Sequence, residues 1–175
     1  VILLVLGVLI AGNVYLGNVN LGYISNGVSY SADKRYLISF TGEIFSYKTI
    51  ETNQIGDDSE FFLNQFINDG FDCLKSINGQ YCAAVYDFLE EKLYLLSDRM
   101  GTRPLYYAEV NNNLFFAPEV KAILKSGINK EIDYHSISEL FSFGHLFGHK
   151  TLFEGIKQLP EASYLIYSKE GCTIH

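Results

Sequence analysis

Charged residues, cysteines and long apolar runs are all scarce in this sequence of 175 residues. Charged residues make up 19% of it, below the roughly 25% of an average globular protein, and the formal net charge is −7. The acidic residues are dispersed, and no basic patch is present to meet the phosphates of a nucleic acid. We therefore expect no nucleic-acid partner.

The sequence has three cysteines, Cys73, Cys82 and Cys172, too few for a disulfide framework. They lie in unrelated contexts and lack the close spacing of a metal site. Reduced thiols are typical of proteins in the cytoplasm, so we expect a cytoplasmic location.

The longest apolar run covers residues 1–11. A membrane-spanning helix needs about 20 such residues, so the run is too short to cross a bilayer. A secretory signal has a positive region before its apolar part, and none is found here. We interpret the run as a buried strand at the centre of a sheet and expect no membrane partner; a severed anchor or signal core is the alternative.

Apolar and polar residues alternate over much of the chain, which has no tryptophan but 13 tyrosines and 13 phenylalanines. These aromatic residues are expected in sheets and core, and the first 50 residues are expected to be mostly β. Further strands are predicted over residues 81–88, 93–97, 105–110, 114–116, 164–167 and 172–175. Helices are predicted over residues 58–69, 71–76, 119–125 and 133–143. Strands and helices occur in separate blocks without repeats or linkers, which predicts a single α+β domain over residues 1–175.

Short acidic residues, glycine and proline mark the ends of several predicted elements. Asp57 or Asp58 is expected to cap the helix over residues 58–69, because a short carboxylate accepts hydrogen bonds from the first free N–H groups. Gly70 is expected to end that helix. Gly42 is expected to form a turn that ends the strand over residues 36–40, and Pro118 to be the first residue of a later helix.

A more specific signal comes from six motifs in a fixed order. They are F-T-G-E-I-F-S-Y at 40–47, D-D-S-E at 57–60, N-G at 78–79, D-R-M-G-T-R-P-L-Y-Y at 98–107, F-F-A-P-E-V-K-A at 115–122 and T-L-F-E-G-I-K-Q-L-P at 151–160. In this order and spacing they resemble the glutamine-hydrolysing domain of the asparagine synthetases, a class II glutamine amidotransferase. The resemblance implies a four-layer αββα sandwich of two antiparallel sheets, the N-terminal-nucleophile hydrolase architecture.

Glutamine hydrolysis is an acyl transfer that needs a nucleophile activated by a base. In this family an N-terminal cysteine supplies the thiolate, and its own amino group acts as the base. The sequence opens with Val1 and its three cysteines lie at interior positions. We therefore expect to find no catalytic residue in this chain.

The resemblance also assigns the residues that bind glutamine. The family's oxyanion pair, an asparagine side chain and the next glycine N–H, corresponds to Thr41 and Gly42. Glu43 and Asp58 match the acidic residues that engage the α-ammonium group, whereas no arginine occurs around residues 21–25 to hold the α-carboxylate. Structural alternatives remain open: a turn glycine at 42, a solvated turn charge at 43 and a plain helix cap at 58.

Two other groups are candidates for a site. Asp98, Arg99 and Arg103 flank a glycine turn, where they form either an anion or interface site or, as we favour, an Asp–Arg pair that pins the loop. His145 and His149 are four residues apart, but glycines interrupt any helix there and no acidic third ligand is near. We expect no metal site.

Three functional hypotheses follow. The first is a degenerate glutaminase domain that supports an ATP-dependent synthetase domain, in cis as the N-terminal part of a longer protein or in trans. The second is an active amidotransferase, converting glutamine to glutamate and ammonia, whose first residues lie upstream of Val1. The third is a regulatory module that binds an amino acid through Glu43 and Asp58. No pyrophosphate loop of the form S-G-G-x-D-S occurs in the sequence, so no cofactor is expected in this chain. ATP and Mg²⁺ are expected only on the synthetase domain. A homodimer is left open.

Overall fold

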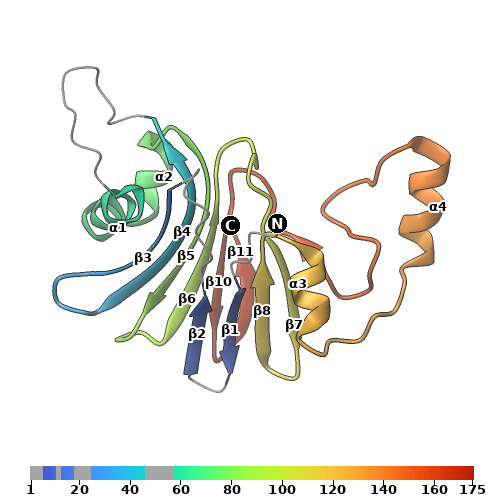
Figure 1. Ribbon diagram of the computed structural model, residues 1–175, viewed down its shortest axis with the longest axis horizontal. Coiled ribbons are helices and arrows are strands. Elements are labelled where there is room, and N and C mark those ends of the chain that lie inside the picture. The colour runs from blue at the N-terminus through green and yellow to red at the C-terminus, as the bar shows by residue number, and fades with distance from the viewer. Residues whose placement is uncertain (1–5, 11–12, 18–24, 46–56) are drawn as a thin grey trace.

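Two antiparallel sheets lie face to face in the computed structural model, which describes residues 6–10, 13–17, 25–45 and 57–175 (Figure 1). The larger sheet contains, in spatial order, β11 (Gly171–Ile174), β10 (Tyr164–Ser168), β6 (Lys92–Ser97), β5 (Gly79–Asp87), β4 (Tyr36–Ile44) and β3 (Ser25–Tyr30). The smaller contains β2 (Asn13–Gly17), β1 (Leu6–Ile10), β8 (Asn113–Ala117), β7 (Tyr106–Val110) and β9 (Lys157–Gln158).

Helices cover the outer faces of both sheets. On the larger sheet lie α1 (Asp58–Asp69), the 3₁₀ turn η1 (Gly70–Asp72) and α2 (Cys73–Ser76), and on the smaller lies α3 (Val120–Lys125) (Figure 1). A fourth helix, α4 (Tyr134–Phe143), stands apart from both sheets (Figure 1). The predicted four-layer αββα sandwich is confirmed. None of the described helices is long and apolar enough to cross a membrane.

Three apolar clusters hold the layers together. One fills the space between the sheets, with Leu95, Leu105 and Phe116 among its members. A second joins the larger sheet to α1 and α2, and a third joins the smaller sheet to α3. Side chains of β4 alternate between two of these clusters, as the two-residue period of a strand requires. Leu37 faces the other sheet, while Ile38 and Phe40 face α1.

Helix α1 begins and ends as predicted. The Asp57 carboxylate accepts a hydrogen bond from the Ser59 N–H at 3.0 Å, and Gly70 ends the helix with a positive φ of 58°. Phe62, fully buried, places its ring 5.7 Å from that of Phe40 and 5.2 Å from that of Tyr81. The helix is thereby fixed on the strands that carry the candidate site.

Two predicted boundaries are wrong. Strand β4 does not end at Gly42 but continues through it to Ile44, paired on one side with β3 and on the other with β5. Helix α3 begins at Val120 with Glu119 as its cap residue, so Pro118 precedes the helix.

The interior strand predicted at the start of the chain is confirmed for residues 6–10, because β1 lies between β2 and β8. Residues 1–5 and 11 lie outside the described residues.

Candidate functional site

Gly42 lies within β4 at a point where two strands approach very closely. Its partner in the register is Tyr81 on β5, and its φ is +142°. A Cβ atom at this position would lie 2.0 Å from the Gln80 carbonyl oxygen and 2.6 Å from the Tyr81 Cα. Only glycine fits, because both neighbouring atoms belong to the backbone of a paired strand. The close approach, and not a turn, accounts for this glycine.

Thr41 turns its side chain into the space between the sheets. It is 3% exposed, and within the described part of the chain its hydroxyl has no hydrogen-bond partner. The hydroxyl of Ser39, two residues earlier on the same side of β4, is also unpartnered there. Both residues line a small hollow whose other walls include Cys82, Leu105 and Phe116. Each unpaired buried hydroxyl costs about 1–3 kcal/mol relative to a bonded one.

The three cysteines are poor nucleophiles. Burial raises the pKa of Cys82, which pairs with Thr41 across β4 and β5, to about 12. Burial is also the largest cause that raises the pKa of Cys73 and of Cys172 to about 12. The thiolate is the reactive form of cysteine, and at neutral pH these thiols stay protonated.

Asp58 holds the start of α1 against the end of β4. It is 1% exposed, and its carboxylate accepts a hydrogen bond from the Ile44 N–H at 3.3 Å. The helix cap is Asp57, so the alternative of a plain cap at Asp58 is wrong. Glu43, the residue before Ile44, is exposed. Two acidic residues are thus brought to one end of the sandwich, one buried and one open to solvent.

Asp98 pins the loop that leads from β6 in one sheet to β7 in the other. Its buried carboxylate accepts hydrogen bonds from the backbone N–H groups of Tyr81, at 3.0 Å, and Met100, at 2.8 Å, and from the Thr102 hydroxyl. Burial opposes ionisation, but these hydrogen bonds outweigh it and hold the pKa of Asp98 below its ordinary value. The loop is pinned as predicted, but not by an Asp–Arg pair. The Arg99 guanidinium donates to the Lys75 carbonyl oxygen instead.

The first arginine of the sequence lies far from this end of β4. Arg35 pairs with Asp87 through an N–O contact of 2.7 Å, where Asp87 is opposite Tyr36 at the start of the strand. Arg103, which follows the Asp98 turn, is half-buried, and its charge opposes the effect of burial on the Cys82 pKa. Its nearness to Cys82 comes from the loop between the sheets, which local sequence patterns do not reveal. Residues 21–24, in the segment that has no arginine for the α-carboxylate, lie outside the described residues.

The histidines predicted not to bind metal lie on the segment after α4. His145 stacks edge-on against Phe147 with ring centroids 4.7 Å apart. Within the ranges that the structure describes, no group of three or more histidine, cysteine or acidic side chains is arranged to hold a metal ion. The candidate site therefore consists of the end of β4, the acidic residues Glu43 and Asp58, and the hollow beside Thr41.

Comparison with known proteins assigns the chain to a family. The family model described as a glutamine amidotransferase domain matches residues 6–175. The chain belongs to the glutamine amidotransferase family. This amidotransferase domain is 30% identical over 156 residues to asparagine synthetase [glutamine-hydrolyzing] 3 of Bacillus subtilis, covering 83% of the chain and 25% of that relative. It is 27% identical over 139 residues to a putative asparagine synthetase of Methanocaldococcus jannaschii, covering 75% of the chain and 27% of that relative.

Solved structures support the fold of the amidotransferase domain. Glutamine phosphoribosylpyrophosphate amidotransferase from B. subtilis, complexed with ADP and GMP, superposes with a TM-score of 0.52 at 13% identity. The match covers 85% of this chain and 30% of that one. The predicted resemblance and architecture are confirmed, and the chain spans about a quarter of the length of its curated relatives.

Proposed function

We propose that this amidotransferase domain does not hydrolyse glutamine and instead serves as structural support for an ATP-dependent amide-forming domain. The observation that carries the proposal is Thr41, which stands where the resemblance places the asparagine of the oxyanion pair. Its buried hydroxyl replaces a longer carboxamide that would donate from its NH₂ group. Removal of one oxyanion donor lowers the rate about 100- to 1,000-fold.

The chemistry of the remaining groups supports this proposal. None of the chain's own thiols is ionised near neutral pH, since burial raises the pKa of each to about 12. The single guanidinium before β4, that of Arg35, is engaged by Asp87 at the opposite end of the strand. A reacting glutamine would therefore lack both an activated nucleophile and the carboxylate partner expected from the family.

A second candidate, an amino-acid-binding regulatory module, is favoured by the acidic pair at the end of β4. The Asp58 carboxylate is buried beside the backbone that carries the exposed Glu43. A carboxylate in a poorly hydrated position attracts an ammonium group more strongly than one in water. Gly42, Glu43 and Asp58 are the residues that we propose for contact with an amino acid.

Glutamate and ammonia release from glutamine tests the first proposal. The natural full-length gene product is compared with its Thr41→Asn variant, each with and without the ATP-dependent domain. We expect no release above the uncatalysed rate in any of these samples. Robust release by the natural product would mean that a nucleophile is supplied from outside this chain, and it would establish the active amidotransferase instead.

Calorimetric titration with glutamine, glutamate and asparagine tests the second candidate. Asp58→Asn is the informative variant and Asp57→Asn its matched control, because asparagine is as good a helix cap as aspartate. Binding that is lost in Asp58→Asn and kept in Asp57→Asn supports the regulatory module. No heat of binding from the natural protein with any of the three amino acids rules it out.

ATP and Mg²⁺ belong, in this proposal, to the domain that this chain supports. The basis is that relatives named as asparagine synthetases extend over about four times the length matched here. Whether that domain lies in the same polypeptide or in a separate one is decided by mass spectrometry of the natural product.

A further inference from the structure

Helix α4 is held in a fixed position although it packs on neither sheet. The Asp133 carboxylate caps it by accepting from the His135 and Ser136 N–H groups at 3.0 and 3.1 Å. The Asp133 N–H donates to the Leu152 carbonyl oxygen at 3.0 Å, which ties the helix start to the segment before β9. Near the middle of the helix, Glu139 pairs with Lys150 at 2.5 Å. The helix is therefore presented at a defined place on the molecule.

One half of the circumference of α4 is apolar. At 100° per residue, Tyr134, Ile137, Leu140, Phe141 and Phe143 lie within one half of the helix, which they share with the buried Ser136. Serines, a histidine and Glu139 occupy most of the opposite arc. An apolar stripe of this width normally faces a protein core.

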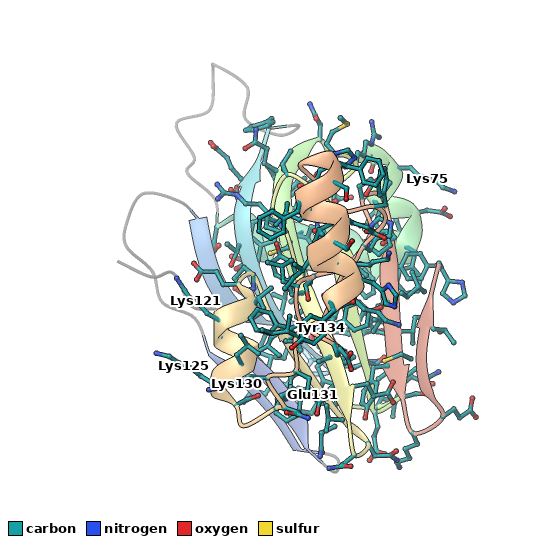
Figure 2. All side chains as sticks on the ribbon, turned by 90° about the vertical axis from the view of Figure 1, so that its right-hand side faces the viewer. Lys75, Lys121, Lys125, Lys130, Glu131 and Tyr134 are labelled. Atoms are coloured by element: carbon teal, nitrogen blue, oxygen red, sulfur yellow. The ribbon has the colours of Figure 1, made fainter. Side chains whose placement is uncertain are left out.

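Most of this apolar side is open to solvent in the part of the chain that the structure describes, whereas Ile137 is half-buried. Phe141 is 86% exposed, Tyr134 77% and Phe143 61%. Figure 2 shows α4 on the face of the molecule nearest the viewer, with Tyr134 near its lower end. Phe147 extends the patch, since its ring lies 5.1 Å from that of Phe143. We call the patch made by Tyr134, Leu140, Phe141, Phe143 and Phe147 the α4 face.

Two physical arguments show that the α4 face needs a partner. A helix of ten residues is marginal in water without tertiary packing. A contiguous exposed patch that contains several aromatic side chains marks an interaction site more often than an ordinary surface. Aromatic residues are also those that contribute most of the binding energy at interfaces.

We infer that the α4 face is the docking surface for the ATP-dependent synthetase portion. The relatives of this chain that are named as asparagine synthetases are about four times as long as the stretch it matches. The inference deepens the proposed function and rests on it. The α4 face can cover on the order of 500 Å² on each partner, given about 200 Å² for each large aromatic side chain. That total of about 1,000 Å² is ordinary for contacts between domains of one assembly.

The same area argues against a second copy of this chain as the occupant. Stable complexes between independent proteins bury about 800 Å² per partner, more than the α4 face supplies alone. The net charge of −7 adds repulsion between copies, since the α4 face brings no positive charge to offset it. A tethered or co-assembled synthetase portion faces neither difficulty, because tethering raises its effective concentration.

The test measures binding in trans. The probe is the synthetase-type polypeptide of the same organism, expressed without its amidotransferase residues where both lie in one gene. Calorimetry compares this chain with its Phe141→Asp and Tyr134→Ser variants. We expect the dissociation constant to rise about tenfold or more in Phe141→Asp, as for a central aromatic residue of an interface.

Leu89→Asp is the matched control. Leu89 is apolar and 69% exposed, within the range of the residues of the α4 face, but it lies in the turn between β5 and β6. Far-UV circular dichroism and thermal melting check that each variant folds like the parent chain. We expect Leu89→Asp to bind the probe like the parent chain.

Three outcomes overturn the inference: no binding by the parent chain, equal binding by Phe141→Asp, or self-association in sedimentation that Phe141→Asp abolishes. None of these outcomes decides whether the proposed function is correct. Glutamate release is assayed in the same samples, so an active glutaminase that binds the probe through the α4 face would refute the first proposal and keep this one.

Discussion

At the scale of single residues, close packing around the end of β4 determines which residues fit there. Gly42 is required by the backbone of the neighbouring strand, and Thr41 points into a small hollow with its hydroxyl unpaired there. Both positions belong to the motif that identified the family. The turn predicted at Gly42 is wrong, because the strand contacts that require a glycine there are not visible in a local pattern.

Gly42→Ala is expected to destabilise the domain by roughly 3–5 kcal/mol, the range of the largest single-residue effects. The added Cβ has no room between the backbone atoms of Gln80 and Tyr81. Urea unfolding measures the change. The control is Gly127→Ala, which also has a positive φ, 91°, but open space around it. It should cost only about 1 kcal/mol, and equal losses in both variants would contradict the steric argument.

Thr41→Val is expected to leave the free energy of unfolding unchanged or to raise it by up to about 1 kcal/mol. Valine has the same shape, and the exchange removes a buried hydroxyl that has no partner in the described structure. Thr151→Val is the contrast, because the buried Thr151 hydroxyl donates to the Ile156 carbonyl oxygen at 2.8 Å. Thr151→Val should lower the free energy of unfolding by about 1–3 kcal/mol. A comparable loss in Thr41→Val would show that its hydroxyl is bonded in solution.

At the scale of elements, α1 and α4 show two uses of the same helical pattern. Both were predicted from apolar spacing, α1 also from an aspartate before its first turn, and both begin and end within one residue of the prediction. The apolar side of α1 packs on β4, β5 and β6, whereas that of α4 is mostly exposed. Periodicity reveals that an apolar face exists, but only the packing of the chain shows what covers it.

Phe62→Ala should cost about 3–5 kcal/mol, as the loss of a fully buried aromatic ring does in other cores. The reason is the cavity left between the Phe40 and Tyr81 rings. Ile67→Ala, on the same helix but 42% exposed, should cost well under half of that. Thermal unfolding of the pair measures the difference, and similar melting temperatures would mean that α1 is not packed as described.

At the scale of the whole molecule, the two sheets are joined through the loop that Asp98 pins between β6 and β7. The pKa of Asp98 is lowered, so its contribution to stability is complete above the unfolded-state pKa of about 3.9. That contribution is lost as the pH falls through the lower folded-state pKa. The connection between the sheets is thus sensitive to acid.

Asp98→Asn is expected to lower the free energy of unfolding at pH 7 by about 1–3 kcal/mol, because its amide group cannot accept all the hydrogen bonds that the carboxylate accepts. The variant should also lose less stability than the parent between pH 5 and pH 3. Urea unfolding across this pH range measures both effects. Asp69→Asn, at an exposed position, serves as the control. A parallel pH dependence in parent and Asp98→Asn would contradict the role of this carboxylate.

The sequence by itself determined the family, the α+β class and most strands and helices, because motif order, alternation and capping residues are local properties of the chain. Only the tertiary structure decided that Gly42 lies inside a strand, that Asp58 bonds to Ile44, and that Asp98 binds backbone N–H groups and no arginine. It also decided which apolar faces are covered. These features depend on which segments, distant in sequence, come to lie side by side, and such contacts arise only when the sheets pack.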